Sequence, residues 1–300
     1  MNNMSIMFRP PYEARSYLLL VTSGCSHNAC RFCTMYKDVP FEEAPLDLVE
    51  KQLMYEAERR PHTKRVFLEN GDPFTLSAGY LLKVSEMIHS YLPEVERITM
   101  YAQIRNIMTK TDEELKALAK AGIGELNIGL ESGMDSVLRY LRKGYTAEEA
   151  LKQMKRLTAA GISFSVNIIF GAAGAGNGIA HAKETAAVLN EAQPYLVFTN
   201  TIHSEKGCDL YDDMQEGRFI EPTFGEYIAE EEQFLTDLEM KDAEYYGIHP
   251  ANVLQLRGRL PSDKEALLRE LRSQRDSADP ELLKQRPRRL DSEGMIINWN

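Results

Sequence analysis

The chain has 300 residues, of which 43% are hydrophobic, and a formal net charge of −10. This length suffices for one large domain, or for one domain with an appendage. A protein that grips long nucleic acid needs a basic face to neutralise phosphates, so the acidic charge disfavours a nucleic-acid substrate. No apolar run approaches the roughly 20 residues of a membrane helix, and the first residues lack the pattern of a signal peptide. We therefore expect a cytoplasmic protein without membrane contact.

Three of the four cysteines lie close together, at Cys25, Cys30 and Cys33. They follow the apolar segment 16–22, which predicts a buried strand, so they lie on a loop at a strand's C-terminal end. Clustered cysteines in a cytoplasmic chain indicate metal or redox chemistry rather than a disulfide framework. Three thiolates leave one ligand position open, as catalytic metal sites do. A zinc site completed by His27 is the alternative, since zinc accepts a Cys3His ligand set.

Hydrophobic periodicity predicts six strands, and a helix follows each of the first five. The strands are expected at 17–22, 65–69, 97–101, 125–130, 163–170 and 195–201. The helices are expected at 45–60, 77–92, 111–121, 135–141, 146–160 and 179–190. This alternation implies parallel strands with right-handed crossovers. Six units are too few for a closed eightfold barrel, and they fit an open, partial barrel or a doubly wound sheet.

The alternation stops after residue 202. Further helices are expected at 208–216, 224–238 and 262–274, the last capped by Ser262, with an extended segment at 252–260. No flexible linker separates this region from the rest. We therefore expect a core at 1–205, which includes an irregular N-terminal segment, and a C-terminal extension at 206–300 that packs on it.

Polar side chains gather where the predicted strands end. In both candidate architectures, ligands bind at the C-terminal ends of the strands. The residues expected at that edge are the cysteine loop, Asn70, Gly71, Asp72, Tyr101, Glu131, Ser132, the Gly-rich loop 171–178 and His203. The sequence therefore predicts a ligand site at this edge of the sheet.

The C-x4-C-x2-C loop, with Phe32 directly before the last cysteine, resembles the cysteine motif of the radical S-adenosylmethionine (SAM) superfamily. The commonest pattern there is C-x3-C-x-aromatic-C, so this loop has one extra residue. The resemblance covers 13–205 and implies a partial (β/α)6 barrel with a helical C-terminal extension. It also implies a [4Fe–4S] cluster held by Cys25, Cys30 and Cys33, with SAM on the fourth iron and Phe32 beside the adenine. In this superfamily an electron from the cluster splits SAM, and the resulting 5′-deoxyadenosyl radical abstracts hydrogen from a substrate.

The resemblance also implies roles for other residues at the strand ends. The turn 70–72 occupies the place of a Gly-Gly-Glu turn that holds the SAM amino group. Glu131, followed by Ser132, matches a strand-4 motif of the coproporphyrinogen-dehydrogenase-like and Elongator-like branches, whose polar residue contacts the ribose. Lys143 matches an arginine position that pairs with the SAM carboxylate. Asn167 matches a polar residue that binds the ribose hydroxyls.

The expected substrate is a small molecule, and Tyr101 and His203 are the candidate catalytic residues. Gln103, Arg105 and Asn200 are further polar residues expected around it. The expected reaction is lyase or oxidoreductase chemistry, for example C–N or C–C cleavage on a modified base such as queuine. The expected electron donor is a flavodoxin or ferredoxin. The alternatives are a non-catalytic zinc or iron–sulfur protein on the same scaffold, and a radical SAM enzyme that modifies RNA.

Overall fold

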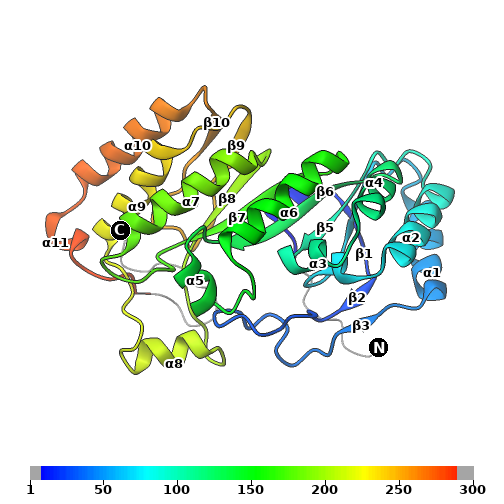
Figure 1. Cartoon of the computed structure of the whole chain (residues 1–300), viewed down its shortest axis with the longest axis horizontal. Helices are drawn as coiled ribbons and strands as arrows, with labels where there is room; N and C mark the ends of the chain where they lie inside the picture. The colour runs from blue at the N-terminus through cyan, green and yellow to red at the C-terminus, as the bar shows by residue number, and fades with distance from the viewer. Residues whose placement is uncertain (1–7, 289–300) are drawn as a thin grey trace. The chain divides into compact units, whose positions relative to one another are not determined.

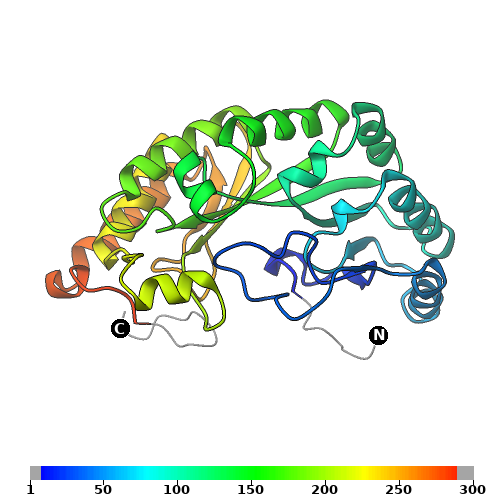
Figure 2. The ribbon, with the colours of Figure 1, turned by 60° about the horizontal axis from the view of Figure 1, so that its bottom comes forward.

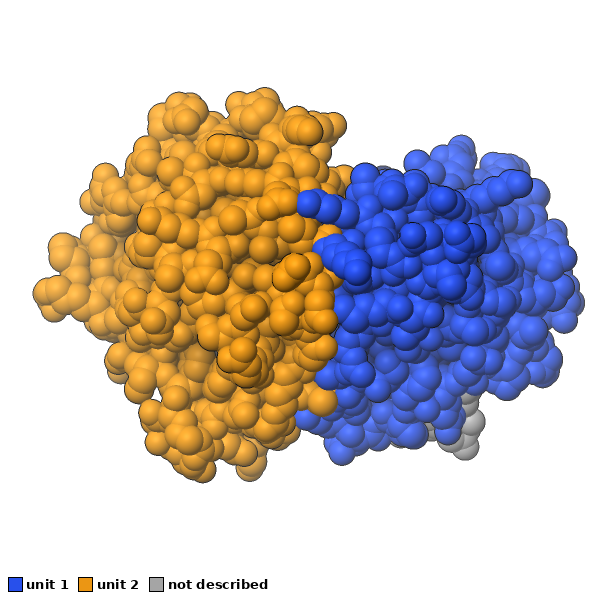
Figure 3. Space-filling view, viewed as in Figure 1, with its two compact units in different colours: residues 1–28, 35–129, 152–164 blue, residues 29–34, 130–151, 165–300 orange. Residues whose placement is uncertain are grey.

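The computed structural model describes residues 8–288 of the chain. The chain divides into two compact units, which Figure 3 colours separately. Unit 1 comprises the chain up to Asn28 together with 35–129 and 152–164, and unit 2 comprises 29–34, 130–151 and the chain from Ser165 on. The expected boundary at residue 205 stays a prediction. The beginning of the expected N-terminal segment, residues 1–7, lies outside the described residues.

Unit 1 is built on parallel strands in the order β1-β4-β5-β6. These are β1 (Tyr17–Leu19), β4 (Arg65–Leu68), β5 (Arg97–Ala102) and β6 (Ile123–Glu131), of which the last two residues belong to unit 2. The register pairs Leu19 with Leu68 and Leu68 with Met100. Consequently the chain leaves β1, β4 and β5 at one edge of the sheet. The segments that follow these strands begin at this edge. They include the cysteine loop after β1 and the turn 70–72 after β4.

Helices cover one side of these strands (Figure 1). They are α1 (Leu46–Arg59), α2 (Ala78–Tyr91) and α4 (Asp112–Lys120). In α2 the buried residues Leu81, Val84 and Ile88 recur at helical spacing, which explains why this segment is a helix with one apolar face. Short elements fill the loops of unit 1: η1 (Pro11–Glu13), β2 (Thr22–Ser23), β3 (Glu42–Glu43), η2 (Pro73–Thr75) and α3 (Ile104–Met108).

Unit 2 carries β8 (Leu196–Thr201), β9 (Ala243–Tyr246) and β10 (Arg257–Leu260), together with β7 (Ser163–Phe170) from Ser165 on. The strands β7, β8 and β9 are parallel, and β10 is antiparallel to β9. The helices after β6 are α5 (Asp135–Tyr140), α6 (Ala147–Ala160), α7 (Gly178–Ala192), α8 (Asp209–Gln215), α9 (Phe224–Asp237), α10 (Lys264–Ser277) and α11 (Pro280–Leu283). Of these, α6 belongs to unit 1 from Lys152 on. Figures 1 and 2 show α7, α9 and α10 side by side along β8 and β9.

The structure confirms the parallel α/β class and all six expected strands, which are β1, β4, β5, β6, β7 and β8. The first is shorter than expected, because the chain leaves the sheet after Leu19 and Thr22–Ser23 pairs with β3. The C-terminal region also differs from expectation, since it is not only helical and adds β9 and β10 next to β8. Ser262 does not cap a helix: its Oγ donates to Arg259 O, and α10 starts after Asp263.

Among the residues that the structure describes, no helix is both long enough and apolar enough to cross a membrane.

Candidate functional site

The turn after β4 holds the start of the cysteine loop within unit 1. Gly71 N–H donates to Gly24 O at 3.0 Å. A Cβ atom at Gly71 would lie 2.5 Å from Cys25 Cβ, so only glycine allows this approach. Asn70 has a φ of 80°, a left-handed conformation that asparagine adopts more readily than most residues. This geometry accounts for an asparagine where the resemblance leads us to expect glycine.

The side chain of Asp72 is fully buried and binds three residues of unit 1. Its Oδ1 accepts the Ser26 backbone N–H at 2.8 Å, and its Oδ2 accepts the Ser26 hydroxyl. Oδ2 also accepts Gln103 Nε2 at 2.9 Å and Asn106 Nδ2 at 3.4 Å. Hydrogen bonds to a carboxylate are stronger than those between neutral groups. Asp72 therefore fastens the residue after Cys25 to the end of β5.

Two buried oxygens beside this turn have no hydrogen-bond partner among the described residues: Glu69 Oε1 and Asn70 Oδ1. Burial raises the pKa of Glu69 to about 7, and Arg9 opposes this rise. Buried polar atoms are almost always satisfied in folded proteins, so unmatched acceptors suggest a ligand or water. An ammonium group, such as the one that SAM carries, has the donors that these oxygens need.

In unit 2, four of the polar residues expected from the sequence form one network. Lys143 Nζ lies 3.0 Å from Glu131 Oε1, and Asn167 Nδ2 donates to Glu131 Oε2 at 2.5 Å. Asn200 Nδ2 donates to Asn167 Oδ1 at 2.8 Å. Asn200 Oδ1 is buried and has no partner in the part of the chain that the structure describes. The ends of β6, β7 and β8 thus supply one connected set of polar side chains.

The ammonium of Lys143 is held in its charged form inside unit 2. Burial disfavours the charge, but Glu131, Tyr145 and Cys30 outweigh it and raise the pKa of Lys143 well above its usual value. Tyr145 OH donates to Leu130 O at 3.2 Å, and burial raises the pKa of this phenol.

A second set of buried, hydrogen-bonded side chains in unit 2 consists of Ser132, His181 and Glu230. His181 Nδ1 lies 2.6 Å from Glu230 Oε1, and its Nε2 lies 2.9 Å from Ser132 Oγ. Glu230 Oε2 accepts the Gly171 N–H at 3.0 Å, and Ser132 Oγ accepts the Met134 N–H. All three side chains are at most 1% exposed. The Ser132 hydroxyl thereby positions the segment after Glu131.

The remaining candidates are placed separately. Tyr101 is half-buried with its ring edge-on to Phe67 at 5.3 Å, and burial raises the pKa of its phenol. His203 is half-buried in the loop after β8, with Nδ1 3.4 Å from Thr201 O. Phe32 is half-buried in the cysteine loop.

The three clustered cysteines are half-buried and form no disulfide. No group of three or more His, Cys, Asp or Glu side chains is gathered as metal ligands among the described residues. Arg31 fixes the second half of the loop in unit 2. Its N–H donates to Leu141 O at 3.2 Å, its Nε donates to Tyr140 O at 3.0 Å, and its guanidinium pairs with Asp213.

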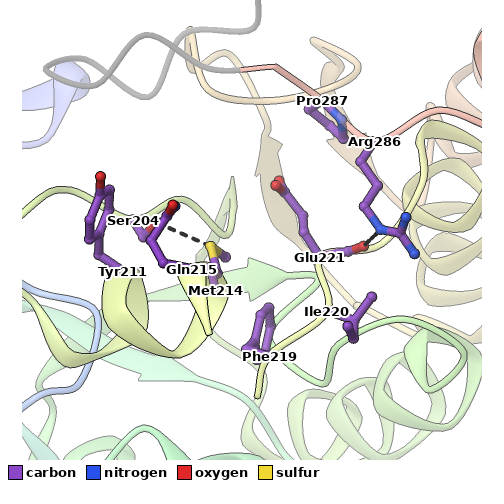
Figure 4. A pocket seen from close by; sticks show the side chains of 9 residues that line it. All are labelled: Ser204, Tyr211, Met214, Gln215, Phe219, Ile220, Glu221, Arg286 and Pro287. Carbon is purple, nitrogen blue, oxygen red and sulfur yellow. Dashed lines mark hydrogen bonds between the residues drawn. The ribbon is translucent and has the colours of Figure 1, made fainter. Parts of the chain in front are cut away.

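A pocket of about 410 Å³ lies in unit 2 beyond the end of β8 (Figure 4). It is lined by Ser204, Tyr211, Met214, Gln215, Phe219, Ile220, Glu221, Arg286 and Pro287. Arg286 Nε donates to Glu221 O at 2.7 Å, which joins two parts of its wall. The pocket begins one residue after His203, a candidate catalytic residue.

Sequence reasoning missed several residues of these networks. Ser26, Asn106 and Tyr145 carry no motif of their own. His181 offered a signal that could have been used, because it is a polar residue on the buried face of α7 with Ala182 and Thr185. A polar residue on an otherwise apolar face is usually hydrogen-bonded inside the protein.

The chain matches a known family over more than half of its length. The family described as the Radical SAM superfamily matches residues 19–175. The heme chaperone HemW of Bacillus subtilis (strain 168) is 26% identical over 233 residues, which are 75% of this chain and 59% of that protein. The crystal structure of methylornithine synthase (PylB) has a TM-score of 0.54 at 13% identity and covers 91% of this chain and 83% of that one. The archaeal Methanocaldococcus infernus Elp3 has a TM-score of 0.52 at 14% identity and covers 86% of this chain and 63% of that one.

The chain belongs to the radical SAM superfamily. The fold of these solved structures agrees with the expected partial TIM-type barrel. The expected cofactors, a [4Fe–4S] cluster and SAM, follow from this membership. The chain spans 59% of the length of the Bacillus subtilis relative and 38% of a HemW from Lactococcus lactis subsp. lactis (strain IL1403).

The residues at the strand ends fit both cofactors. The cysteine loop offers three thiols, which match three irons of a [4Fe–4S] cluster and leave one iron for another ligand. Lys143 supplies a buried cation, and Glu69, Asn70 and Asn200 supply oxygens without partners among the described residues.

Proposed function

We propose that this protein is a radical SAM enzyme that abstracts hydrogen from a small-molecule substrate. The observation that carries the proposal is the three-cysteine loop, whose start is fastened to the turn 70–72. When bound, the cluster and SAM supply a 5′-deoxyadenosyl radical. The protein's own part is to hold the cluster through Cys25, Cys30 and Cys33 and to orient SAM.

In this proposal, the roles that the family motifs imply for the strand-end residues concern SAM. Asn70, with its unmatched Oδ1, accepts a hydrogen bond from the SAM amino group. Lys143 faces the SAM carboxylate, and Glu131 and Asn167 face its ribose. Glu131 also keeps Lys143 charged before SAM binds. Phe32 covers the adenine.

The substrate lies near Tyr101 and His203 in this proposal. A net charge of −10 supports a small molecule over a nucleic acid. The reaction that we propose for testing is C–N or C–C cleavage, as on a modified base such as queuine, with oxidation as the other outcome. A cytoplasmic flavodoxin or ferredoxin supplies the electron. The C-terminal extension, 206–300, shapes the substrate side through the pocket after β8.

Anaerobic reconstitution with iron and sulfide tests this proposal. We expect about four irons per chain, as in a [4Fe–4S] cluster, and release of 5′-deoxyadenosine from SAM on reduction. Cys30→Ala should abolish this release. Cys208→Ala is the matched control, because Cys208 is buried at the start of α8, outside the cysteine loop. Stoichiometric zinc without SAM cleavage would instead support the non-catalytic protein.

Heme carriage is the second candidate function, and the similarity to HemW proteins favours it. Titration of the reconstituted protein with haemin separates the two candidates. A saturable Soret band at one haemin per chain, without release of 5′-deoxyadenosine, would favour carriage. SAM cleavage that a substrate accelerates would favour the enzyme.

A further inference from the structure

Gln103 donates both hydrogens of one amide nitrogen inside unit 1. Its Nε2 lies 2.9 Å from Asp72 Oδ2 and 3.6 Å from Cys25 Sγ. An amide nitrogen carries two N–H groups, so both contacts can be made together. Gln103 is 8% exposed, and sequence reasoning placed it near a substrate. In the structure, its amide faces the first cysteine of the loop.

The orientation of this amide is determined by its surroundings. Asp72 is an acceptor when ionised, so the atom of Gln103 that faces it must be the nitrogen and not the oxygen. Asp72 is itself fixed by Ser26, and Asn106 Oδ1 accepts the Gln103 backbone N–H at 2.7 Å. The second N–H of Gln103 is thereby aimed at Cys25 Sγ.

We propose that Gln103 raises the reduction potential of the cluster through an N–H···S bond to Cys25. This role rests on the proposed ligation by Cys25. Reduction adds one electron to the cluster, and the negative charge of its sulfur ligands grows. A fixed N–H dipole aimed at one sulfur stabilises the reduced form more than the oxidised form. Hydrogen bonds to the sulfurs are one of the factors that set iron–sulfur potentials.

The replacement Gln103→Met tests the proposal, because methionine has similar length and no N–H group. At a given applied potential, we expect the ratio of oxidised to reduced cluster to be about tenfold higher in this variant than in the unaltered protein. For a one-electron couple, this ratio corresponds to a potential lower by about 59 mV. The potential is measured by EPR-monitored titration with mediators, anaerobically and without SAM. The control is Gln153→Met, since Gln153 is a buried glutamine of unit 1 that accepts from Arg156 rather than facing a cysteine.

The possible results separate the two proposals. If the unaltered protein assembles no cluster, the proposed function fails. If it assembles one, and Gln103→Met keeps full iron and sulfide content with the potential of Gln153→Met, the role of Gln103 is overturned.

A second measurement decides the case in which Gln103→Met loses the cluster. The unaltered protein is labelled with 15N at its glutamine amides, and pulsed EPR is recorded on the reduced cluster without SAM. A weak 15N coupling is expected from Gln103. Absence of this coupling overturns the proposal.

Discussion

Gly71 is the residue at which the turn after β4 meets the cysteine loop. Its missing side chain leaves room for Cys25, and its N–H bonds to Gly24. The atoms nearest to a Cβ added at Gly71 are the Cα and Cβ of Cys25 and the oxygen of Gly24, which cannot swing away as the end of a long side chain could. The absence of a side chain at Gly71 is therefore required for the observed position of Cys25.

We predict that Gly71→Ala destabilises the protein by about 1–3 kcal/mol, the usual range for overpacking, and lowers the iron content after reconstitution. Urea unfolding and iron analysis measure the two effects. Gly79→Ala is the control, because no atom lies within 4 Å of a Cβ added at Gly79 in α2. That change should stabilise the helix by about 0.5–1 kcal/mol. Equal effects of both changes would contradict the prediction.

The pair Lys143–Glu131 yields a second prediction at this scale. Both side chains are buried, so Lys143→Met leaves a carboxylate in the interior without its cation. We expect a loss of about 3–5 kcal/mol in the free energy of unfolding and weaker SAM binding. The double variant Lys143→Met with Glu131→Gln should recover most of the stability but not the SAM affinity, which calorimetry measures.

A matched control for this pair is Lys64→Met. Lys64 pairs with Glu96 at the same 3.0 Å distance, but both side chains are exposed to solvent. Exposed pairs contribute little, so stability and SAM affinity should hardly change. If Lys143→Met changed the free energy of unfolding and the SAM affinity as little as Lys64→Met does, the prediction for the buried pair would be wrong.

Among the elements, α9 has an unusual buried face. It carries Glu230 and Glu231 among apolar residues such as Phe234 and Leu235. Glu230 bonds His181 of α7, and Tyr245 OH of β9 donates to Glu231 Oε1 at 2.6 Å. The helix is thus tied to a neighbour on each side by a carboxyl group. Burial raises the pKa of Glu231 to about 7, and Glu230 adds to this effect while the bond from Tyr245 opposes it.

This pKa predicts how stability changes with pH. The pKa of Glu231 is raised from an ordinary 4.5 to about 7 in the folded state. Between these values the native state holds a proton that the unfolded state releases. The contribution of Glu231 is therefore fully present below pH 4.5, falls as the pH rises to about 7, and is constant above.

The variant Glu231→Gln measures this contribution, since glutamine does not titrate. Its stability relative to the unaltered protein should improve by on the order of 3 kcal/mol between pH 4.5 and pH 7, which corresponds to the shift of the pKa. Urea unfolding at a series of pH values gives the difference. A difference that does not vary with pH would show that Glu231 does not take up this proton.

Most strands were predictable, because a parallel strand that is buried on both faces is a run of apolar residues. Most helices were predictable from their periodicity and from the capping residues at their starts. Ser163–Phe170 has the predicted bounds, and Thr111 forms the predicted capping box. The short strand β9 was missed, because Ala243–Tyr246 is too short and too polar at Glu244 to show a pattern. α3 was missed for the same reason.

The site was predictable only in part. Residues in a motif, such as Cys25 and Glu131, could be predicted as site residues, because they lie at the C-terminal ends of predicted strands. Their partners could not, because the contacts of Gln103 and His181 depend on packing between distant segments. Asp72 was expected to face SAM, and the structure shows its carboxylate occupied by Ser26, Gln103 and Asn106.

For the whole molecule, ligand linkage gives a further prediction. A ligand that binds only the native state stabilises it, and SAM at a hundredfold excess over its Kd should add about 2.7 kcal/mol. We expect a higher Tm for the protein with cluster and SAM than with cluster alone. After removal of iron by a chelator, SAM should have little effect, because its open iron is gone. An equal rise in Tm for the iron-free protein would contradict the proposed binding mode.

The bonds between Ser26 and Asp72 also have an evolutionary consequence. They join positions that are 46 residues apart in the chain, one in the cysteine loop and one in the turn after β4. A change at Asp72 removes the acceptor of both bonds, and a change at Ser26 removes the hydroxyl donor, so a change at one position can be compensated at the other. The two positions should therefore covary among homologous sequences.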